Sequence, residues 1–180
     1  RFDHEPAGTY SVEIDGATVG EDMLVLTQGT ANLSGITVGD DLDVRAAGAI
    51  TAAGLNATGL GPDGLQLTYS TNGFTIGQGE GASSVDGADI TLQSFGASIN
   101  ASGLSAGDDI ALTAATTIAL NGATTLGLGI TGGDSSISTT GGDTTVSGLD
   151  SFSDVLIDSA GAVNVAGTVR AGRDVTIGAD

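Results

Sequence analysis

Gly107-Asp108-Asp109-Ile110-Ala111-Leu112 joins a small polar turn and an acid to an apolar–any–apolar run, and the chain repeats this unit. A near copy is Gly39-Asp40-Asp41-Leu42-Asp43-Val44, and weaker copies lie at residues 87–92, 153–157 and 172–177. We interpret each copy as the corner and first strand of one coil of a solenoid. The rest of the chain then fills the distance from one start to the next.

The spacing of these units indicates a period close to 20 residues. Ile90 and Ile110 are 20 positions apart, as are Val155 and Val175. A strand with only two inward side chains cannot offset its own ordering entropy, but stacked coils share hydrogen bonds and form inner columns of like side chains. The sequence therefore predicts an all-β, right-handed parallel β-helix with about 20 residues and three short strands per coil. At this period, 180 residues make roughly nine coils.

The composition agrees with a narrow core of small aliphatic side chains. Glycine accounts for 31 residues, aromatics for only 3%, and there is no cysteine. Frequent glycine disfavours helices, and glycine or aspartate at corners supplies turn geometry. A left-handed β-helix would need stricter six-residue repeats, and a β-sandwich would lack the 20-residue recurrence.

We expect residues 1–9 to be an irregular lead-in and residues 10–180 to form a single solenoid domain. A coil beginning at 61–67 runs long, to about 25 residues, with a longer loop near 69–86. The nine-residue repeat within 132–148 is interpreted as two short faces of a polar coil. No signal peptide is visible, and both ends fall in mid-pattern, which suggests an excerpt of a longer chain.

The net charge of −18, with four arginines and no lysine, disfavours two classes of partner. Nucleic acids and anionic membranes are bound through clustered basic residues. No run of about 18 apolar residues exists for direct membrane insertion. The expected partners are a protein or glycan surface, or copies of the chain itself.

Three segments resemble the coils of filamentous haemagglutinin-type bacterial exoproteins: residues 39–52, 106–114 and 171–179. The resemblance is one of repeat type and covers most of residues 20–180. It implies a right-handed β-helix and export to the cell surface or the extracellular space. It transfers no binding site, because binding functions in that family lie outside the generic coils.

An acid precedes the first strand of several coils, and two interpretations of this column stay open. The column comprises Asp41, Asp89, Asp109, Asp154 and Asp174. Aspartate in a corner accepts backbone hydrogen bonds, which is the interpretation we favour. Alternatively, stacked carboxylates bind Ca²⁺, with Asp40-Asp41 and Asp108-Asp109 as the densest pairs.

Other candidate chemistry is weaker, and we assign no catalytic, cofactor-binding or metal residue. The Gly-Gly-Asp units at 132 and 141 carry Ile137 and Val146 where a calcium repeat needs aspartate. His4, beside Asp3 and Glu5, lies in the lead-in. Polysaccharide cleavage lacks a base, since Arg45 is the only mid-chain cation and the sequence assigns it no acidic partner.

The outward positions of the first strands suggest a contact surface. They read Asp43, Thr91, Ala111, Leu156 and Thr176, mostly small and polar, with Leu24 and Leu156 as apolar exceptions. We expect a non-enzymatic stalk or adhesive surface-display segment of a large bacterial exported protein, without a cofactor. The alternative is an assembly subunit that pairs through open coil ends or edges, and a Ca²⁺-binding solenoid or polysaccharide-active enzyme is a weaker one.

Overall fold

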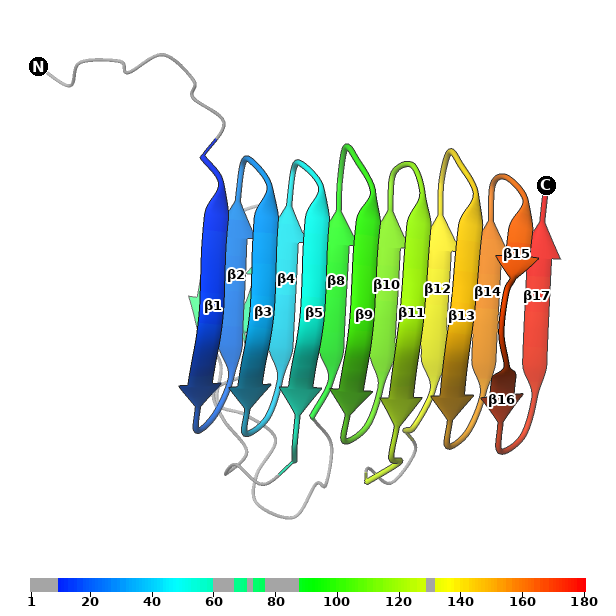
Figure 1. Cartoon of the computed structure of the whole chain (residues 1–180). Helices are drawn as coiled ribbons and strands as arrows, with labels where there is room; N and C mark the ends of the chain where they lie inside the picture. The colour runs from blue at the N-terminus through cyan, green and yellow to red at the C-terminus, as the bar shows by residue number, and fades with distance from the viewer. Residues whose placement is uncertain (1–9, 60–66, 71–72, 77–87, 129–131) are drawn as a thin grey trace, which may run out of the picture.

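The computed structural model describes residues 10–59, 67–70, 73–76, 88–128 and 132–180. Within these ranges the regular structure consists of strands, and all but one antiparallel pair stack in two long parallel sheets (Figure 1). In these two sheets the chain passes from one sheet to the other and back, so that each passage through both sheets makes one coil. The prediction of an all-β solenoid with parallel stacking is confirmed.

One sheet is built from short strands of five residues and is here named the short-strand sheet. Its members, in spatial order, are β2 (Met23–Thr27), β4 (Leu42–Ala46), β8 (Ile90–Ser94), β10 (Ile110–Ala114), β12 (Ser135–Thr139), β14 (Val155–Ser159) and β17 (Val175–Ala179). The acid-plus-apolar units of the sequence lie at the starts of these strands.

The second sheet, the long-strand sheet, contains eight-residue strands and one divided strand. Its members are β1 (Val12–Val19), β3 (Ala31–Val38), β5 (Ile50–Ala57), β9 (Ile99–Ala106), β11 (Ile118–Thr125), β13 (Thr144–Ser151), β15 (Val163–Val165) and β16 (Val169–Ala171). The last two both pair with β13, at its start and at its end.

A glycine with positive φ stands at the fifth position of every eight-residue strand. These glycines are Gly16, Gly35, Gly54, Gly103, Gly122 and Gly148, with φ from +59° to +81°. In β5, positions one, three, six and eight are buried, so the inward alternation shifts by one residue at the glycine. The predicted second and third strands of each coil are therefore one strand bent at a left-handed residue, a conformation that glycine adopts without steric cost.

The core lies between the sheets as columns of aliphatic side chains. Register places Val44, Leu92, Leu112, Ile137 and Ile157 one above another in the short-strand sheet, all essentially inaccessible to solvent. Burying each such side chain stabilises the folded state by on the order of 2 kcal/mol, because its apolar surface is removed from water. The narrow core explains why the chain has so few aromatic residues.

The described residues between β5 and β8 add no strand to either long sheet. Leu42 of β4 pairs directly with Ile90 of β8, and Ile50 of β5 with Ile99 of β9. β6 (Leu67–Ser70) and β7 (Gly73–Ile76) instead form an antiparallel pair. The prediction of a coil beginning at 61–67 was wrong, because the pairing leaves no place for it; residues 60–66, and most of the loop expected near 69–86, lie outside the described residues.

The nine-residue repeat forms the two strands of one coil, as predicted. Its halves are β12 and β13, which pair with β10 and β11 of the preceding coil. Ser135 stands in register with Ile110, and Thr144 with Ile118. Hydroxyl side chains thus replace aliphatic ones at inward positions of this coil.

Candidate functional site

The aspartates that precede the short strands form a continuous column, here named the aspartate ladder. It comprises Asp22, Asp41, Asp89, Asp109, Asp134, Asp154 and Asp174. The backbone N–H of each later member donates to the Oδ1 atom of the aspartate one coil earlier, at 2.7 to 3.3 Å. The five aspartates predicted to align do so, and their carboxylates act in turn geometry, as favoured. The partner, however, is the neighbouring coil rather than the aspartate's own corner.

Sequence reasoning missed two members of the ladder. Asp22 directly precedes Met23 of β2, and Asp134 directly precedes Ser135 of β12. Gly20-Glu21-Asp22-Met23 matches the unit Gly39-Asp40-Asp41-Leu42 except for a glutamate at the second position, whereas a serine follows Asp134 where the unit has an apolar residue. An acid immediately before a short strand was the signal that would have found both.

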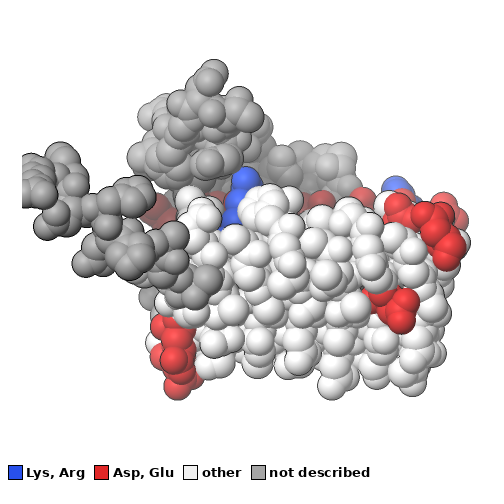
Figure 2. Space-filling model, turned by 90° about the horizontal axis from the view of Figure 1, so that it is seen from above, with Lys and Arg blue, Asp and Glu red and all other residues white. Residues whose placement is uncertain are grey.

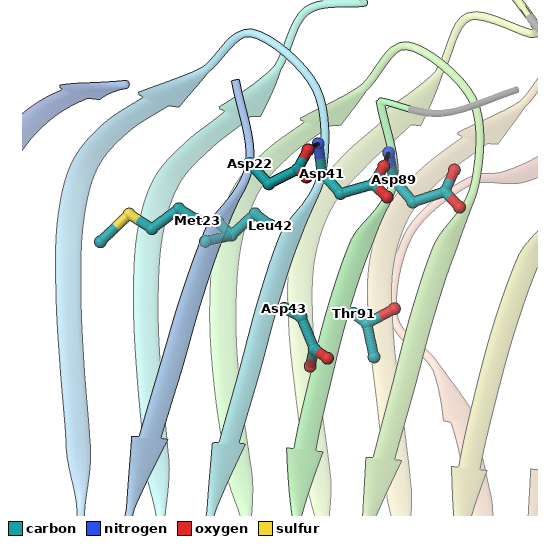
Figure 3. Close-up of a pocket in the computed structure, with 7 residues that line it drawn as sticks. All are labelled: Asp22, Met23, Asp41, Leu42, Asp43, Asp89 and Thr91. Carbon is teal, nitrogen blue, oxygen red and sulfur yellow. Dashed lines mark hydrogen bonds between the residues drawn. The ribbon is translucent and has the colours of Figure 1, made fainter. Parts of the chain in front are cut away.

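A cavity of about 180 Å³ lies beside the first three members of the ladder. Asp22, Asp41 and Asp89 form a row at the strand starts, with Asp43 and Thr91 further along the strands (Figure 3). Met23 and Leu42 complete the lining. The cavity is therefore acidic at one end and has an aliphatic wall.

Burial perturbs two of these carboxyl groups. Loss of hydration raises the pKa of Asp89 to about 7, and the charges of Asp41, Asp109 and Asp108 add to the rise, while the N–H of Asp109 opposes it. Burial likewise raises the pKa of Asp22 to about 6, with Asp40 and Asp41 contributing repulsion. With these raised pKa values both groups are partly protonated near pH 6 to 7, which lessens the like-charge crowding within the ladder.

The other end of the ladder carries a compensating cation. The guanidinium of Arg173 pairs with the carboxylate of Asp154, with Nε 3.1 Å from Oδ1. This hydrogen bond, helped by the N–H of Asp174, lowers the pKa of Asp154. The ladder therefore runs from carboxyls with raised pKa values, Asp22 and Asp89, to the ion-paired carboxylate of Asp154.

Asp40 and Asp143, which lie outside the ladder, also act as backbone acceptors. Asp40 is buried and accepts from the N–H of Ala88 at 3.2 Å, and Asp108 is buried within the adjoining turn. Asp143, from the second Gly-Gly-Asp unit, accepts from the N–H of Ala162 at 2.9 Å. In the part of the chain that the structure describes, no group of three or more histidine, cysteine, aspartate or glutamate side chains is arranged to hold a metal ion.

Arg45 has an acidic partner, contrary to the expectation that none could be assigned. Its Nη2 lies 2.7 Å from Oδ2 of Asp43, and its Nε contacts both carboxylate oxygens at 2.9 and 3.0 Å. The two residues are outward-facing neighbours on β4, two positions apart. This fork fixes the guanidinium of Arg45 beside the carboxylate of Asp43.

The outward positions agree with the predicted column in register. Asp43, Thr91 and Ala111 are half-buried, whereas Leu156 is exposed. Leu24, named as an apolar exception, is only half-buried, and Leu26 is the exposed leucine of β2. His4, Asp3 and Glu5 lie outside the described residues.

Two clusters of buried hydroxyl groups were not anticipated as interacting sets. In one, the Ser151 hydroxyl donates to the carbonyl of Gly133 at 2.6 Å and lies 3.2 Å from the hydroxyls of Thr125 and Ser135. In the other, Ser159 lies 3.0 Å from Thr139 and 3.2 Å from Thr144. Because these groups satisfy one another, the polar coil can be buried without the cost of unpaired hydroxyls.

Comparisons with known proteins place the chain in no family. No family model, no curated protein and no solved structure matches it. Within the described residues, no helix has the length and apolar character needed to cross a membrane.

Proposed function

We propose that this chain is a rigid stalk or surface-display segment of a bacterial exported protein of the filamentous haemagglutinin type. In this proposal the coils wind as a right-handed β-helix, and the segment works outside the cell. The observation that carries it is the unbroken axial stacking: parallel pairing links each coil to the next in both sheets. The repeat-type sequence resemblance supports the same family.

Three kinds of interaction bind each coil to its neighbour along the rod. Backbone hydrogen bonds in both sheets run along the axis, inward side chains stack in columns, and the aspartate ladder ties one turn to the next. A load along the axis is shared among these interactions at every level. The segment is therefore suited to hold another domain at a fixed distance.

Single-molecule stretching tests the mechanical part of the proposal. The chain is placed between marker domains and pulled from its ends. We expect successive force peaks, each releasing about 20 residues, or roughly 65 Å of extended chain. Featureless extension without peaks would contradict a load-bearing stalk. Protease accessibility of the parent protein on intact cells tests the surface location.

A second candidate, an assembly subunit, is favoured by one observation. Val165, Val175 and Ile177 at the β15–β17 end are 40%, 47% and 47% exposed, although their register partners are buried. Edge strands such as β15 and β17 carry unpaired backbone groups and are templates for further strand pairing. Particle length measured by small-angle scattering at several concentrations separates the candidates: a stalk keeps one length, whereas an assembly subunit grows, and Ile177→Lys stops the growth.

A further inference from the structure

Two asparagines on the outer face of the long-strand sheet lie in the acceptor sequence for N-linked glycosylation. Asn32-Leu33-Ser34 belongs to β3, and Asn100-Ala101-Ser102 belongs to β9. Each consists of an asparagine, a residue other than proline, and a residue with a hydroxyl group, which is the pattern that N-glycosylating transferases recognise. A glycan is bulky and hydrated, so an asparagine that carries one must lie at the protein surface.

Both asparagines are exposed at the second position of their strands, between two buried residues. Because side chains alternate along a strand, the asparagine and the serine two positions later point outward on the same face. Among the described residues, the side chains of Asn32, Asn100 and Ser102 take part in no hydrogen bond, whereas the hydroxyl of Ser34 donates to Oδ1 of Asp15 at 2.5 Å. A sugar on Nδ2 of either asparagine would extend into solvent and leave the hydrogen bonds of both sheets intact.

The fold does not require asparagine at this strand position. Register places Asn32 and Asn100 in one column with Thr51 between them, followed by Ala119 and Thr145 in the next coils. Residues of such different polarity serve the same position, so the sheet forms without asparagine there. Figure 2 looks onto the side where the long strands start, and it shows acidic side chains gathered mainly toward the two ends of the rod. Since β9 lies in the middle of its sheet, a glycan at Asn100 would have small, uncharged neighbours.

Three other outward asparagines provide natural comparisons. In Asn56-Ala57-Thr58 the asparagine is half-buried, and the Thr58 hydroxyl donates to a backbone carbonyl of the preceding coil at 3.1 Å. Asn121 and Asn164 are exposed, but an alanine stands two positions after each of them. These two match Asn100 in exposure and lack only the hydroxyl residue that completes the acceptor sequence.

We propose that Asn100 and Asn32 are acceptors for N-linked glycosylation. Nδ2 of the asparagine attacks the anomeric carbon of a sugar that is activated as a diphosphate. The new C–N bond forms as the bond between that carbon and the phosphate oxygen breaks. The diphosphate leaves with the electron pair, and a base of the transferase takes one amide proton. This modification goes beyond the stalk function and does not depend on it, and it places carbohydrate on the outer face of the long-strand sheet.

Tandem mass spectrometry of the protein isolated from the organism that produces it tests the two sites, with fragmentation that keeps the glycan on the peptide. We expect the peptides that contain Asn100 and Asn32 to carry the added mass of hexose or N-acetylhexosamine units. Peptides with Asn121 and Asn164 should carry none. Addition of single sugars would identify a nucleotide-linked donor, and addition of a preassembled oligosaccharide would identify a lipid-linked one.

Ser102→Ala should abolish the modification of Asn100 and leave that of Asn32, and Ser102→Thr should restore it. Neither variant should change the melting temperature, because Ser102 is an outward residue whose hydroxyl forms no hydrogen bond with a described residue. Ala166→Ser is the matched control: it completes the acceptor sequence after Asn164, which shares the register column of Asn100, and should add a glycan there.

Absence of a glycan from both Asn100 and Asn32 in the native protein would overturn the inference. A glycan that persists on Asn100 in the Ser102→Ala variant would overturn it as well, because the acceptor sequence would then not direct the transfer. The force peaks of the stalk would remain in either case, so failure of the modification is distinguishable from failure of the mechanical function.

Discussion

The carboxylate of Asp89 accepts a hydrogen bond from the backbone N–H of Asp109, one coil further along, at 2.9 Å. The same relationship links the other members of the ladder, so each turn is completed by a side chain from its neighbour. Asp89 is the member whose environment changes its titration most clearly, and it gives the first prediction.

Stability should fall as pH rises from about 4 to about 7. The folded-state pKa of Asp89 is about 7 and that of Asp22 about 6, both above the value of 3.8 for a free carboxyl. The folded state therefore binds more protons in this window, and deprotonation favours unfolding. Allowing for partial exposure, the effect of Asp89 is on the order of 1–3 kcal/mol. Thermal unfolding at pH 5 and pH 8 measures it.

Asp89→Asn should raise the melting temperature at pH 8 and flatten this pH dependence. The asparagine oxygen still accepts from Asp109, but no buried charge forms. Asp150→Asn, which removes an exposed charge from β13, controls for net charge and should leave the slope unchanged. A slope that persists in Asp89→Asn would assign the pH dependence to other groups.

A second prediction concerns how the ladder aspartates stabilise the fold. We expect the carboxylate oxygen to contribute more to the free energy of unfolding as a hydrogen-bond acceptor than through its charge. Asp109→Ala deprives the N–H of Asp134 of its 2.7 Å partner and should cost about 1–2 kcal/mol, measured as a shift in the urea midpoint. Asp109→Asn removes the same charge but keeps the acceptor, and should lose less than half as much. Equal losses in the two variants would show that charge, not capping, is the contribution.

Gly122→Ala should destabilise the long-strand sheet by about 1–2 kcal/mol. Its φ is +79°, and an added Cβ would meet its nearest atom, the nitrogen of Gly103, only at 3.8 Å. The loss therefore comes from backbone conformation rather than from a clash. Gly20→Ala is the control, since that Cβ meets nothing within 4 Å and the residue does not lie in the left-handed region. A neutral Gly122→Ala variant would refute the role assigned to the bend.

Ser151→Ala should cost about 1–3 kcal/mol, because it leaves buried hydrogen-bond partners of Ser151 unsatisfied. Its hydroxyl contacts Gly133 and Asp154 carbonyls as well as Thr125 and Ser135. Ser136→Ala, at an outward position of β12, should change stability by less than 0.5 kcal/mol. Chemical unfolding of both variants under one set of conditions makes the comparison.

Calcium should stabilise the chain no more than magnesium at equal ionic strength. The Oδ1 atoms of the ladder already accept backbone hydrogen bonds, so divalent ions act by screening the net charge. Calorimetric titration and melting temperatures with each ion measure this. Saturable heat specific to Ca²⁺ would instead support the calcium-binding interpretation of the aspartate column.

The recurrence of an acid before an apolar pair was enough to predict the coil, because both features depend on local sequence. Register followed wherever the period held, as for Ile90 and Ile110. The predicted register failed between β5 and β8. There the antiparallel pair of β6 and β7 has apolar residues of its own, such as Phe74, and their spacing resembles that of a coil. Periodicity cannot distinguish a coil from an antiparallel pair, since the two differ in which neighbouring strand each strand forms its hydrogen bonds with.

The site was less predictable than the fold. The turn role of Asp109 followed from its residue type, but its partner in the next coil depends on stacking. The sequence analysis did not pair Arg45 with Asp43. The two residues are two positions apart and therefore on the same face of one strand, where their side chains meet. The exposed ring of Phe95 could not be predicted either, since only the structure shows that its turn is equivalent to those in which Ala47 and Ala115 make the same backbone hydrogen bond.

The ladder also bears on how such a chain can change in length. Its members are 19 or 20 positions apart except where Asp41 precedes Asp89 by 48 and Asp109 precedes Asp134 by 25. Both longer intervals place their additional residues before the next aspartate, so the bond between turns survives. Tandem duplication or loss of one whole unit would likewise rejoin an existing donor to an existing acceptor. A gene encoding such coils could therefore grow or shrink by recombination while each product remained able to fold.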